Sequence, residues 1–396
     1  MPKTRFNIWR VLVGIFVGAA IFYLGILTGQ GRLGPDAIFG RPVAKGLPAD
    51  LDYSSIETVY DSLRANFDGD LDVNKLIDGL KKGLADATGD PYTVYLTTDE
   101  AKELNEQLTG TFEGIGAELG KDADKNIIVI APLPGTPAEK AGLKARDIIA
   151  QIDGKSASGL SVDEAKDKIR GAKGTSVKLR IVRDGSASDI EIVRDTITIA
   201  SVNSKILDGN IGYMQITRFG EDTVARAKQA AEQFKQAGVK GVVVDVRSDP
   251  GGLLDASIDV SSLWLQDKTV LTERRGGQVV KTYRSKGTAT LAGVPTVVLI
   301  DEGSASASEI MAGALRDNNV ATLIGAKSFG KGSVQQLVKF LEGDELKVTI
   351  ARWYTPSGKN IDGQGIEPDQ KVERTDEDFK AGRDPQLDAA LQFLKK

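Results

Sequence analysis

Two segments in the second half of the chain carry the residues best suited to chemistry. The first is Asp-Glu-Gly-Ser-Ala-Ser-Ala-Ser-Glu-Ile at 301–310, and the second is Phe-Gly-Lys-Gly-Ser-Val-Gln at 329–335. The 396-residue chain contains no histidine, so a serine nucleophile here cannot be activated by imidazole, and a Ser-His-Asp triad is excluded. A lysine is the alternative base for such a serine.

A lysine acts as a base only in its neutral form. Its reference pKa of about 10.4 must fall by roughly three units for that form to be abundant near neutral pH. Burial lowers the pKa of a lysine because desolvation disfavours the ammonium. Lys331 is flanked by Gly330 and Gly332, which allow the backbone to pack closely around it. The segment therefore predicts a buried lysine with a lowered pKa.

The composition excludes several kinds of site. The chain has no cysteine, which excludes disulfides, thiolate catalysis and cysteine-based metal sites. Because histidine is also absent, a transition-metal site would consist of carboxylates alone, and no paired-carboxylate motif stands out. A net charge of −4 leaves no basic footprint for nucleic acid. We expect two or three folded domains without a metal, a cofactor or a nucleic-acid partner.

An apolar segment follows a basic cluster at the N-terminus. The 17 residues from Val11 to Leu27 carry no charge, and Lys3, Arg5 and Arg10 precede them. At 1.5 Å per residue, a helix of this length reaches about 26 Å, close to the ~30 Å of a hydrocarbon core. The positive-inside rule places the N-terminus in the cytoplasm and the rest of the chain outside. Residues 1–32 are therefore predicted to form a membrane anchor; a cleaved signal sequence is the alternative, although no Ala-x-Ala site follows.

Residues 33–110 are predicted to hold a linker followed by helices. The stretch up to about residue 50 is rich in Gly, Pro and Ala and has no sustained period, which is typical of a tether. Apolar residues then recur with helical spacing, first at Ile56, Val59, Tyr60 and Leu63 and then at Leu76, Ile77, Leu80 and Leu84. A third helix is predicted from Thr98 to Leu108. These helices are either plain scaffold or a surface that pairs with a second copy of the chain.

Between residues 111 and 194, short strands rich in β-branched residues surround one helix. The predicted strands are Ile127–Ile130, Ile148–Ile152, Val177–Val182 and Ile190–Val193. The helix begins after Ser161, which forms a capping box with Glu164, and it ends at Ile169.

This segment resembles a PDZ domain. The resemblance is carried by Glu113-Gly114-Ile115-Gly116-Ala117, Gly135-Thr136-Pro137-Ala138, Ala141-Gly142-Leu143, Asp147-Ile148-Ile149 and Ile152-Asp153-Gly154. One departure is Arg146, where the family usually has glycine; a turn that requires a positive φ would be strained at this position.

The PDZ resemblance implies a peptide-binding site. Backbone N–H groups of the loop would bind a chain-terminal carboxylate while the peptide adds as a strand to the sheet edge. The residues implied in this site are Glu113, Gly114, Ile115, Gly116, Ala117 and, at the end of the helix, Arg170. The implied ligand is a free C-terminus. Taken alone, the glycines would be consistent with an ordinary turn.

After residue 200, strands and helices alternate, which predicts layered α/β structure with buried strands. The predicted elements are strands at 211–216, 242–246 and 296–300 and helices at 223–237 and 306–315. The middle strand runs into Arg-Ser-Asp-Pro-Gly-Gly at 247–252, a turn able to aim N–H groups at an oxyanion. On these residues alone a tight loop is the simpler interpretation, and Ser306 with Glu309 likewise matches a helix capping box.

Read together, the motifs resemble the C-terminal processing peptidases, also called tail-specific proteases. The resembling segments are 247–252, Ser304-Ala-Ser-Ala-Ser-Glu-Ile310, Ala312-Gly313-Ala314-Leu315, 329–335, Tyr354-Thr355-Pro356-Ser357-Gly358 and Ile366-Glu367-Pro368-Asp369. With the PDZ-like segment, the resemblance covers roughly residues 50–372.

The resemblance implies roles for individual residues. Ser306 would be the nucleophile, Lys331 the base that takes its proton, and Gln335 a residue that orients the lysine amine. The implied oxyanion hole consists of backbone N–H groups from Gly251, Gly252 and Ala307. Glu309 would support the site without acting as the base. Asp249 departs from the family, which commonly has asparagine there, and adds an acid near the site.

The implied fold is multidomain α/β. An N-terminal helical segment and a PDZ-like β-rich domain at 111–194 precede a crotonase/ClpP-like layered core at 195–375, and a helical tail follows at 376–396. The implied protein is a serine endopeptidase that is anchored in the bacterial cytoplasmic membrane by a single span, with its catalytic part outside. Its partners would be proteins or peptides with free C-termini, the membrane, and a further copy of the chain in a homodimer or higher oligomer.

Two other functions compete with this expectation. One is a catalytically silent, membrane-tethered peptide-binding scaffold, against which the joint presence of Ser306, Lys331 and Gln335 argues. The other is a crotonase-like acyl-transforming enzyme, which would need neither the PDZ-like segment nor the serine and lysine pair.

Overall fold

The computed structural model describes residues 53–395, which divide into one unit ending at Leu76 and a second unit from Ile77 onward. The anchor predicted at 1–32 and the linker that follows it lie outside the described residues. None of the helices within residues 53–395 combines the length and apolar character that crossing a bilayer requires.

Three helices precede the PDZ-like segment in the chain, as the apolar spacing predicts: α3 (Tyr53–Asn66), α4 (Val73–Asp86) and α5 (Thr98–Thr109). The predicted apolar residues of α3, from Ile56 to Leu63, are between 37% and 60% exposed. Helix α5 begins with a capping box between Thr97 and Glu100 and ends where Gly110 adopts a left-handed conformation.

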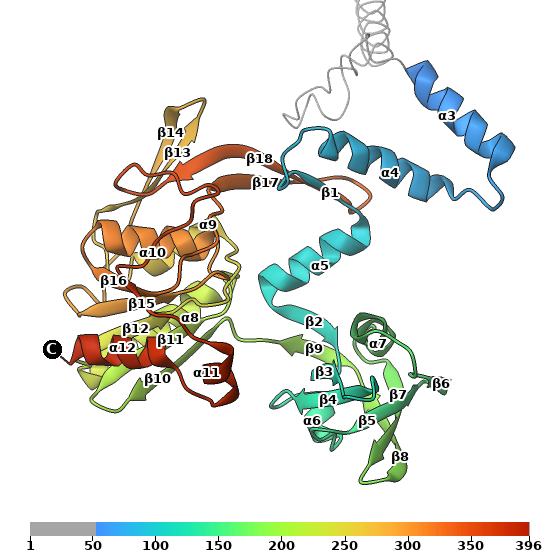
Figure 1. Ribbon diagram of the computed structural model, residues 1–396, viewed down its shortest axis with the longest axis horizontal. Helices are drawn as coiled ribbons and strands as arrows, with labels where there is room; N and C mark the ends of the chain where they lie inside the picture. The colour runs from blue at the N-terminus through green and yellow to red at the C-terminus, as the bar shows by residue number, and fades with distance from the viewer. Residues whose placement is uncertain (1–52, 396) are drawn as a thin grey trace, which may run out of the picture. The chain divides into compact units, whose positions relative to one another are not determined.

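The PDZ segment forms its own sheet and core (Figure 1). Strands β3, β4, β5, β7 and β8 lie in that order, and β6 pairs with β5. Their bounds are β3 (Ala117–Lys121), β4 (Ile127–Pro132), β5 (Ile148–Ile152), β6 (Lys155–Ser156), β7 (Ser176–Arg183) and β8 (Ser186–Val193). Helices α6 (Pro137–Lys140) and α7 (Val162–Ile169) complete it, and the capping box of α7 between Ser161 and Glu164 is present as predicted.

Arg146 adopts a φ of 71°, so the turn before β5 does require the left-handed region in which glycine is favoured. The ends of the PDZ segment are held together by a short ribbon. Strand β2 (Thr111–Gly114) pairs antiparallel with β9 (Asp195–Thr198), so the chain enters and leaves the segment at one place.

The catalytic-core candidate is built on a six-stranded sheet in the order β10, β11, β12, β15, β16, β19. Strand β10 (Val202–Leu207) is antiparallel to β11 (Ile211–Ile216), and all later neighbours are parallel: β12 (Gly241–Asp245), β15 (Thr296–Ile300), β16 (Ala321–Gly325) and β19 (Gln370–Lys371). Every residue of β12 and β15 is buried, which explains their continuous apolar sequence.

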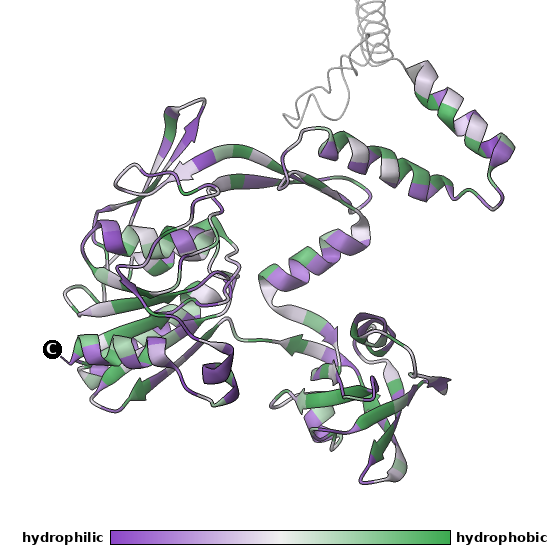
Figure 2. Ribbon diagram, in the orientation of Figure 1, coloured by the Kyte–Doolittle hydropathy of each residue, from purple (hydrophilic) through white to green (hydrophobic). Residues whose placement is uncertain are grey.

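Helices cover both faces of this sheet. Because side chains alternate along a strand, Val242 and Val244 share one apolar cluster with α8 (Thr223–Ala237), α9 (Leu254–Ser261) and α10 (Ala307–Asp317). Val243 points to the other face, where the C-terminal helix α12 (Pro385–Leu394) packs; the short α11 (Asp376–Lys380) precedes it. Figure 2 shows apolar residues running along these strands.

A second, five-stranded sheet contains the hairpin that begins beside Lys331. Its path is β1, β18, β13, β14, and β17 pairs with β18. The bounds are β1 (Val94–Leu96), β13 (Thr269–Arg275), β14 (Gln278–Arg284), β17 (Ser333–Lys339) and β18 (Glu345–Tyr354). Lys81 of α4 forms a 2.8 Å ion pair with Asp344, just before β18.

Arg247 links the central sheet to the C-terminal helix. Its guanidinium forms ion pairs with Asp245 at 2.6 Å and with Asp384 at 2.8 Å. We predict that Arg247→Met lowers the free energy of unfolding by about 3 kcal/mol, because it leaves the buried Asp245 carboxylate without its cation.

Thermal and urea unfolding of the purified protein would measure this change. The matched control is Arg180→Met, which breaks an ion pair with Asp189 whose two side chains are 47% and 30% exposed and should cost less than about 1 kcal/mol. Equal destabilisation by the two substitutions would contradict the prediction.

Candidate active site

The parallel sheet brings two predicted motifs to one edge. Strands β12 and β15 are adjacent and parallel, so the turn after β12 and the turn after β15 emerge side by side. Two hydrogen bonds join them: Ala305 N donates to the Asp249 carbonyl at 3.0 Å, and so does the Ser308 hydroxyl at 3.0 Å. The segments 247–252 and 301–310 therefore form one structural unit.

Ser306 occupies a strained turn immediately before α10. Its φ of 54° and ψ of −110° are unfavourable for a residue with a side chain, at a cost of about 1–3 kcal/mol. Ser306 is half-buried, whereas Ala305 and Ala307 on either side of it are buried. The turn thus presents one hydroxyl at the start of a helix, where the positive end of the helix dipole favours developing negative charge.

Glu309 ties this turn to the lysine segment. Its carboxylate accepts hydrogen bonds from Ser306 N at 2.8 Å, the Ser328 hydroxyl at 2.5 Å, Gly330 N at 2.7 Å and Lys331 N at 2.9 Å. Only 1% of Glu309 is exposed; burial raises its pKa, and these donors oppose the rise. All four acceptor bonds are made to groups of the protein. That Glu309 supports the site without acting as the base stays a prediction.

Lys331 is held in a crowded backbone environment. A Cβ on Gly330 would lie 2.7 Å from Gly365 N, and one on Gly332 would lie 2.7 Å from Asp362 N, so neither position has room for a side chain. The Lys331 side chain is half-buried, and burial lowers its pKa; the nearby Lys347 acts in the same direction and Glu309 in the opposite one. The predicted lowering of the lysine pKa has this physical basis.

The lysine amine lies over an aromatic ring. Lys331 Nζ is 5.2 Å from the centre of the Tyr92 ring. Among the hydrogen bonds of the described residues, none joins Lys331 Nζ to Ser306 Oγ. Gln335 donates to the Ser333 hydroxyl at 2.6 Å and more weakly to Thr349 Oγ1 at 3.4 Å. Its role of orienting the lysine amine stays a prediction.

The Pro-Gly-Gly turn packs directly on the nucleophile turn. A Cβ on Gly251 would lie 2.9 Å from Ser306 Cβ and 2.9 Å from Ala307 N, and one on Gly252 would strike the Phe219 carbonyl. The φ values of 98° and 143° also exclude most side chains. Gly251 is therefore required by the close approach to the Ser306 turn, and Gly252 by the close approach to the Phe219 backbone.

The three predicted oxyanion-hole amides differ in their bonding. Gly251 N donates to Asp249 Oδ1 at 2.8 Å and is buried. Gly252 is exposed, and within residues 53–395 neither its amide nor that of Ala307 has a hydrogen-bond partner. Gly252 and Ala307 thus have free donors beside Ser306, while the Gly251 amide is already occupied.

Asp249 is completely buried beneath this turn. Burial raises its pKa to about 7, although the Gly251 amide, the nearby Ser308 hydroxyl and the charge of Arg218 act in the opposite direction. Oδ1 accepts the Gly251 bond, and Oδ2 has no partner among the described residues.

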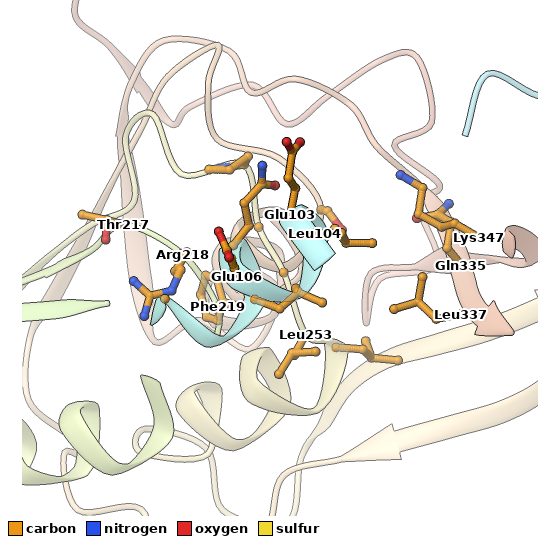
Figure 3. A pocket seen from close by; sticks show the side chains of 18 of the residues that line it. Glu103, Leu104, Glu106, Thr217, Arg218, Phe219, Leu253, Gln335, Leu337 and Lys347 are labelled. Carbon is orange, nitrogen blue, oxygen red and sulfur yellow. The ribbon is translucent and has the colours of Figure 1, made fainter. Parts of the chain in front are cut away.

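Ser306 and Lys331 line one pocket of about 1200 Å³. Figure 3 places Arg218 and Phe219 on one side of it and Gln335 and Lys347 on the other. Apolar side chains of the core make up much of its wall: Leu253, Ile310, Val334, Leu337 and Trp353. Among the described residues, no group of three or more carboxylates is arranged to hold a metal ion.

The predicted peptide-binding loop lies between β2 and β3. Glu113 and Gly114 end β2, Ile115 is 3% exposed, and Ala117 begins β3. Gly116 has a φ of 75°, and a Cβ there would strike the Thr136 side chain, so the loop does require glycine.

Arg170, at the end of α7, is engaged within the protein. It forms a 3.0 Å ion pair with Glu106 of α5, and its guanidinium lies 5.0 Å from the centre of the Phe112 ring.

Sequence reasoning did not find Tyr92, Lys347 or Trp353 as residues of this site. Trp353 Nε1 donates to the Lys331 carbonyl at 2.9 Å and so fixes the backbone of the lysine segment. Tyr92 is more than two hundred residues from Lys331 in sequence, and it precedes β1, which pairs with β18. Lys347 is closer in sequence and lies on β18, the strand that pairs with β17. Trp353 is a buried residue of β18, and the sequence alone does not distinguish such a residue from an ordinary core residue.

Comparison with known proteins identifies the family of the chain. The family model described as Peptidase family S41 matches residues 210–372, and that of the PDZ domain matches residues 103–182. The carboxy-terminal processing protease CtpA of Bacillus subtilis (strain 168) is 38% identical over 348 residues, which are 87% of this chain and 73% of that protein. A protein of Staphylococcus haemolyticus (strain JCSC1435) described as a CtpA-like serine protease is 36% identical over 374 residues, 93% of this chain and 74% of that protein.

A solved structure shares the fold. The crystal structure described as an S41 protease from Bacteroides fragilis NCTC 9343 matches with a TM-score of 0.55 at 16% identity, over 78% of this chain and 87% of that chain. The identity of more than a third over most of both chains, together with the two family models, leads to one conclusion: the protein belongs to peptidase family S41 and is a serine-type peptidase with a PDZ domain ahead of its catalytic domain.

Proposed function

We propose that this peptidase recognises the C-terminal tail of protein substrates through residues 111–194 and cleaves them in the core at 195–375, with Ser306 as nucleophile and Lys331 as base. The observation that supports this most directly is the shared pocket, in which a serine on a strained turn and a half-buried lysine of lowered pKa meet two unoccupied backbone amides. The same combination argues against a silent scaffold.

In the proposed reaction, neutral Lys331 takes the Ser306 proton as Oγ attacks the scissile carbonyl. The oxyanion is stabilised by the N–H groups of Gly252 and Ala307, and the Gly251 amide steadies the turn through Asp249. The lysine ammonium then protonates the leaving amine, which frees an acyl-enzyme on Ser306. A water molecule, deprotonated by Lys331, hydrolyses that ester and restores both groups.

The proposed reaction includes a conformational step. Among the described residues, the Lys331 amine lies over the Tyr92 ring and is not hydrogen-bonded to Ser306 Oγ, so it moves towards Ser306 Oγ before proton transfer. Catalytic hydrogen bonds often tighten only in the substrate complex. We propose that a bound substrate tail favours the paired state by binding it more tightly than the resting one.

We further propose a membrane-anchored enzyme that self-associates. The uncharged run at 11–27 supports a single-span anchor that leaves the catalytic part on the extracytoplasmic side of a bacterial cytoplasmic membrane. The exposed apolar residues Ile56, Val59 and Tyr60 of α3 support pairing with a second copy, because a helix stripe of this kind is stabilised by burial.

Substitution of the serine or the lysine should abolish most of the peptidase activity. Ser306→Ala and Lys331→Ala should each reduce cleavage of an unstructured peptide by at least about 10³-fold, because nucleophile and base act as one unit. Lys331→Arg should be equally inactive, since a guanidinium stays protonated. Peptide cleavage followed by mass spectrometry measures this, with circular dichroism to confirm folding; near-normal turnover by either alanine variant would remove the assignment.

The pH dependence should report the lysine. Burial lowers the pKa of Lys331, so its neutral fraction, and with it kcat/KM, should increase as the pH rises through a value well below the ordinary lysine pKa of about 10.4. Initial rates measured from pH 5 upward test this. A rate that does not change on the acidic side would contradict the prediction, and pre-steady-state rates would show whether product release hides the step.

The PDZ segment should do more than hold the substrate. A short non-cleavable peptide with a free C-terminal carboxylate should accelerate cleavage of a separate reporter peptide, because it favours the paired state. Simple docking predicts inhibition or no effect instead. The amidated peptide is the matched control and should lose the effect; equal behaviour of acid and amide would rule out carboxylate binding by the loop at Gly114–Gly116.

A further inference from the structure

The carboxyl group of Asp249 is the buried acid that the proposed reaction leaves unused. It is completely buried, and one of its oxygens, Oδ2, has no hydrogen-bond partner among the described residues. Leaving a charged carboxylate oxygen unpaired in a buried site is far more unfavourable than leaving a neutral carboxyl unpaired. The environment therefore favours the protonated form.

The position of this group connects it to catalysis. Oδ1 accepts the Gly251 amide at 2.8 Å, and the Asp249 carbonyl accepts the Ala305 amide and the Ser308 hydroxyl, one on each side of Ser306. Gly251 itself packs against Ser306 Cβ. Asp249 thus holds the turn at 247–252, called the oxyanion turn below, against the turn at Ser306.

Charged groups on the same and the neighbouring turn are satisfied elsewhere. Arg247 points away, to the carboxylate of Asp245. Asp301 accepts the Ser248 amide at 2.7 Å and its hydroxyl at 3.2 Å. None of these groups bonds to the Asp249 carboxyl.

The other elements around the turn bring three more charged groups. Glu309 on α10 and Lys331 are joined to each other through the Lys331 amide. Arg218, after β11, is the cation whose charge reaches Asp249, but its guanidinium is paired with Asp222 at 2.8 Å. Its field opposes, and does not cancel, the effect of burial on the pKa of Asp249, which is raised to about 7.

We propose that Asp249 is a positioning residue that works as a neutral carboxylic acid. In this form it holds the Gly251 amide within the oxyanion turn, and loss of its proton slows attack by Ser306. This inference rests on the proposed peptidase reaction. The slowing has two physical causes. A negative charge beneath the turn repels the oxyanion that develops above it in a poorly solvated site. The turn must also rearrange to bring water or a donor to Oδ2.

Asp249→Asn separates charge from shape. Asparagine keeps an oxygen for the Gly251 amide but cannot ionise. In the wild type, kcat/KM should pass through a maximum and then fall by up to about tenfold per pH unit. In Asp249→Asn the alkaline fall should disappear while the acidic rise, which belongs to Lys331, remains.

Two further variants serve as controls. Asp301→Asn changes a carboxylate whose two oxygens are both hydrogen-bonded, and it should keep the alkaline fall. Asp249→Ala removes the acceptor for the Gly251 amide and should lower kcat/KM by at least about tenfold at every pH. An alkaline fall that is the same in wild type and Asp249→Asn would overturn the proposal, as would an Asp249→Ala enzyme as active as Asp249→Asn.

A measurement without turnover keeps this test separate from the proposed function. The folded-state pKa of Asp249 is raised above its unfolded value of about 3.9, so the unfolded chain loses the proton first and wild-type stability falls as pH rises between the two values. The Tm of Asp249→Asn minus that of wild type should therefore grow from pH 4 to about pH 7 and then level off. A constant difference would overturn the inference even if peptides are cleaved, whereas failure of cleavage with a growing difference would overturn the proposed function alone.

Discussion

The buried carboxylate of Glu309 is the interaction on which the geometry of the site depends. It accepts hydrogen bonds from donors on two separate segments, the turn at Ser306 and the stretch from Ser328 to Lys331. A carboxylate has about four acceptor positions, and here each is used by a donor. No neutral side chain of similar size can collect four such bonds. Glu309 therefore holds the nucleophile turn and the lysine backbone together, and Phe329 N adds a further link by donating to the Ser304 carbonyl at 3.0 Å.

A second constraint comes from the sheet. Because β12 and β15 are parallel neighbours, the turns after them emerge at the same edge, and their close approach leaves no room for a side chain at Gly251. The backbone also packs closely around Gly330 and Gly332, on either side of Lys331. In the proposed mechanism, the backbone amides are preorganised and the lysine side chain moves towards Ser306 when substrate binds.

Much of this fold could be predicted from the sequence, because its signals are local. The strands at 211–216 and 296–300 and the helix at 223–237 were predicted with the bounds that the structure has, since uninterrupted apolar runs and a terminal glycine define them. The capping box at Ser161 followed from the same kind of reasoning. The positive φ of Arg146 did not, because it was raised only by the glycine that the PDZ family usually has at this position. The apolar spacing also predicted the α3 helix and its apolar face, but not the bounds of the helix. Spacing alone does not say what covers that face.

The site was predicted less completely, because its remaining features are non-local. The serine and lysine were recognisable by resemblance, but the ring of Tyr92 beside the lysine amine comes from a segment more than two hundred residues away. The occupied amide of Gly251 is a different case. Asp-Pro-Gly favours a turn in which the aspartate side chain accepts an amide two residues on, so this bond was within reach of local reasoning. The burial that changes the chemistry of that aspartate was not, since it arises from α10 packing over the turn.

The hydrogen bonds around Arg218 connect these local features to the PDZ domain. The Arg218 guanidinium donates to the carbonyl of Ile199, and more weakly to that of Thr109, which are the residues where the chain leaves and enters the ribbon of β2 and β9. The next residue, Phe219, donates to the Gly251 carbonyl at 2.8 Å and accepts from Leu253 at 2.7 Å. The linkers of the PDZ domain are therefore bonded, through two consecutive residues, to the turn that carries the proposed oxyanion donors. Arg218, whose charge reaches Asp249, and Phe219 thus connect the ribbon of β2 and β9 to the turn that contains Asp249.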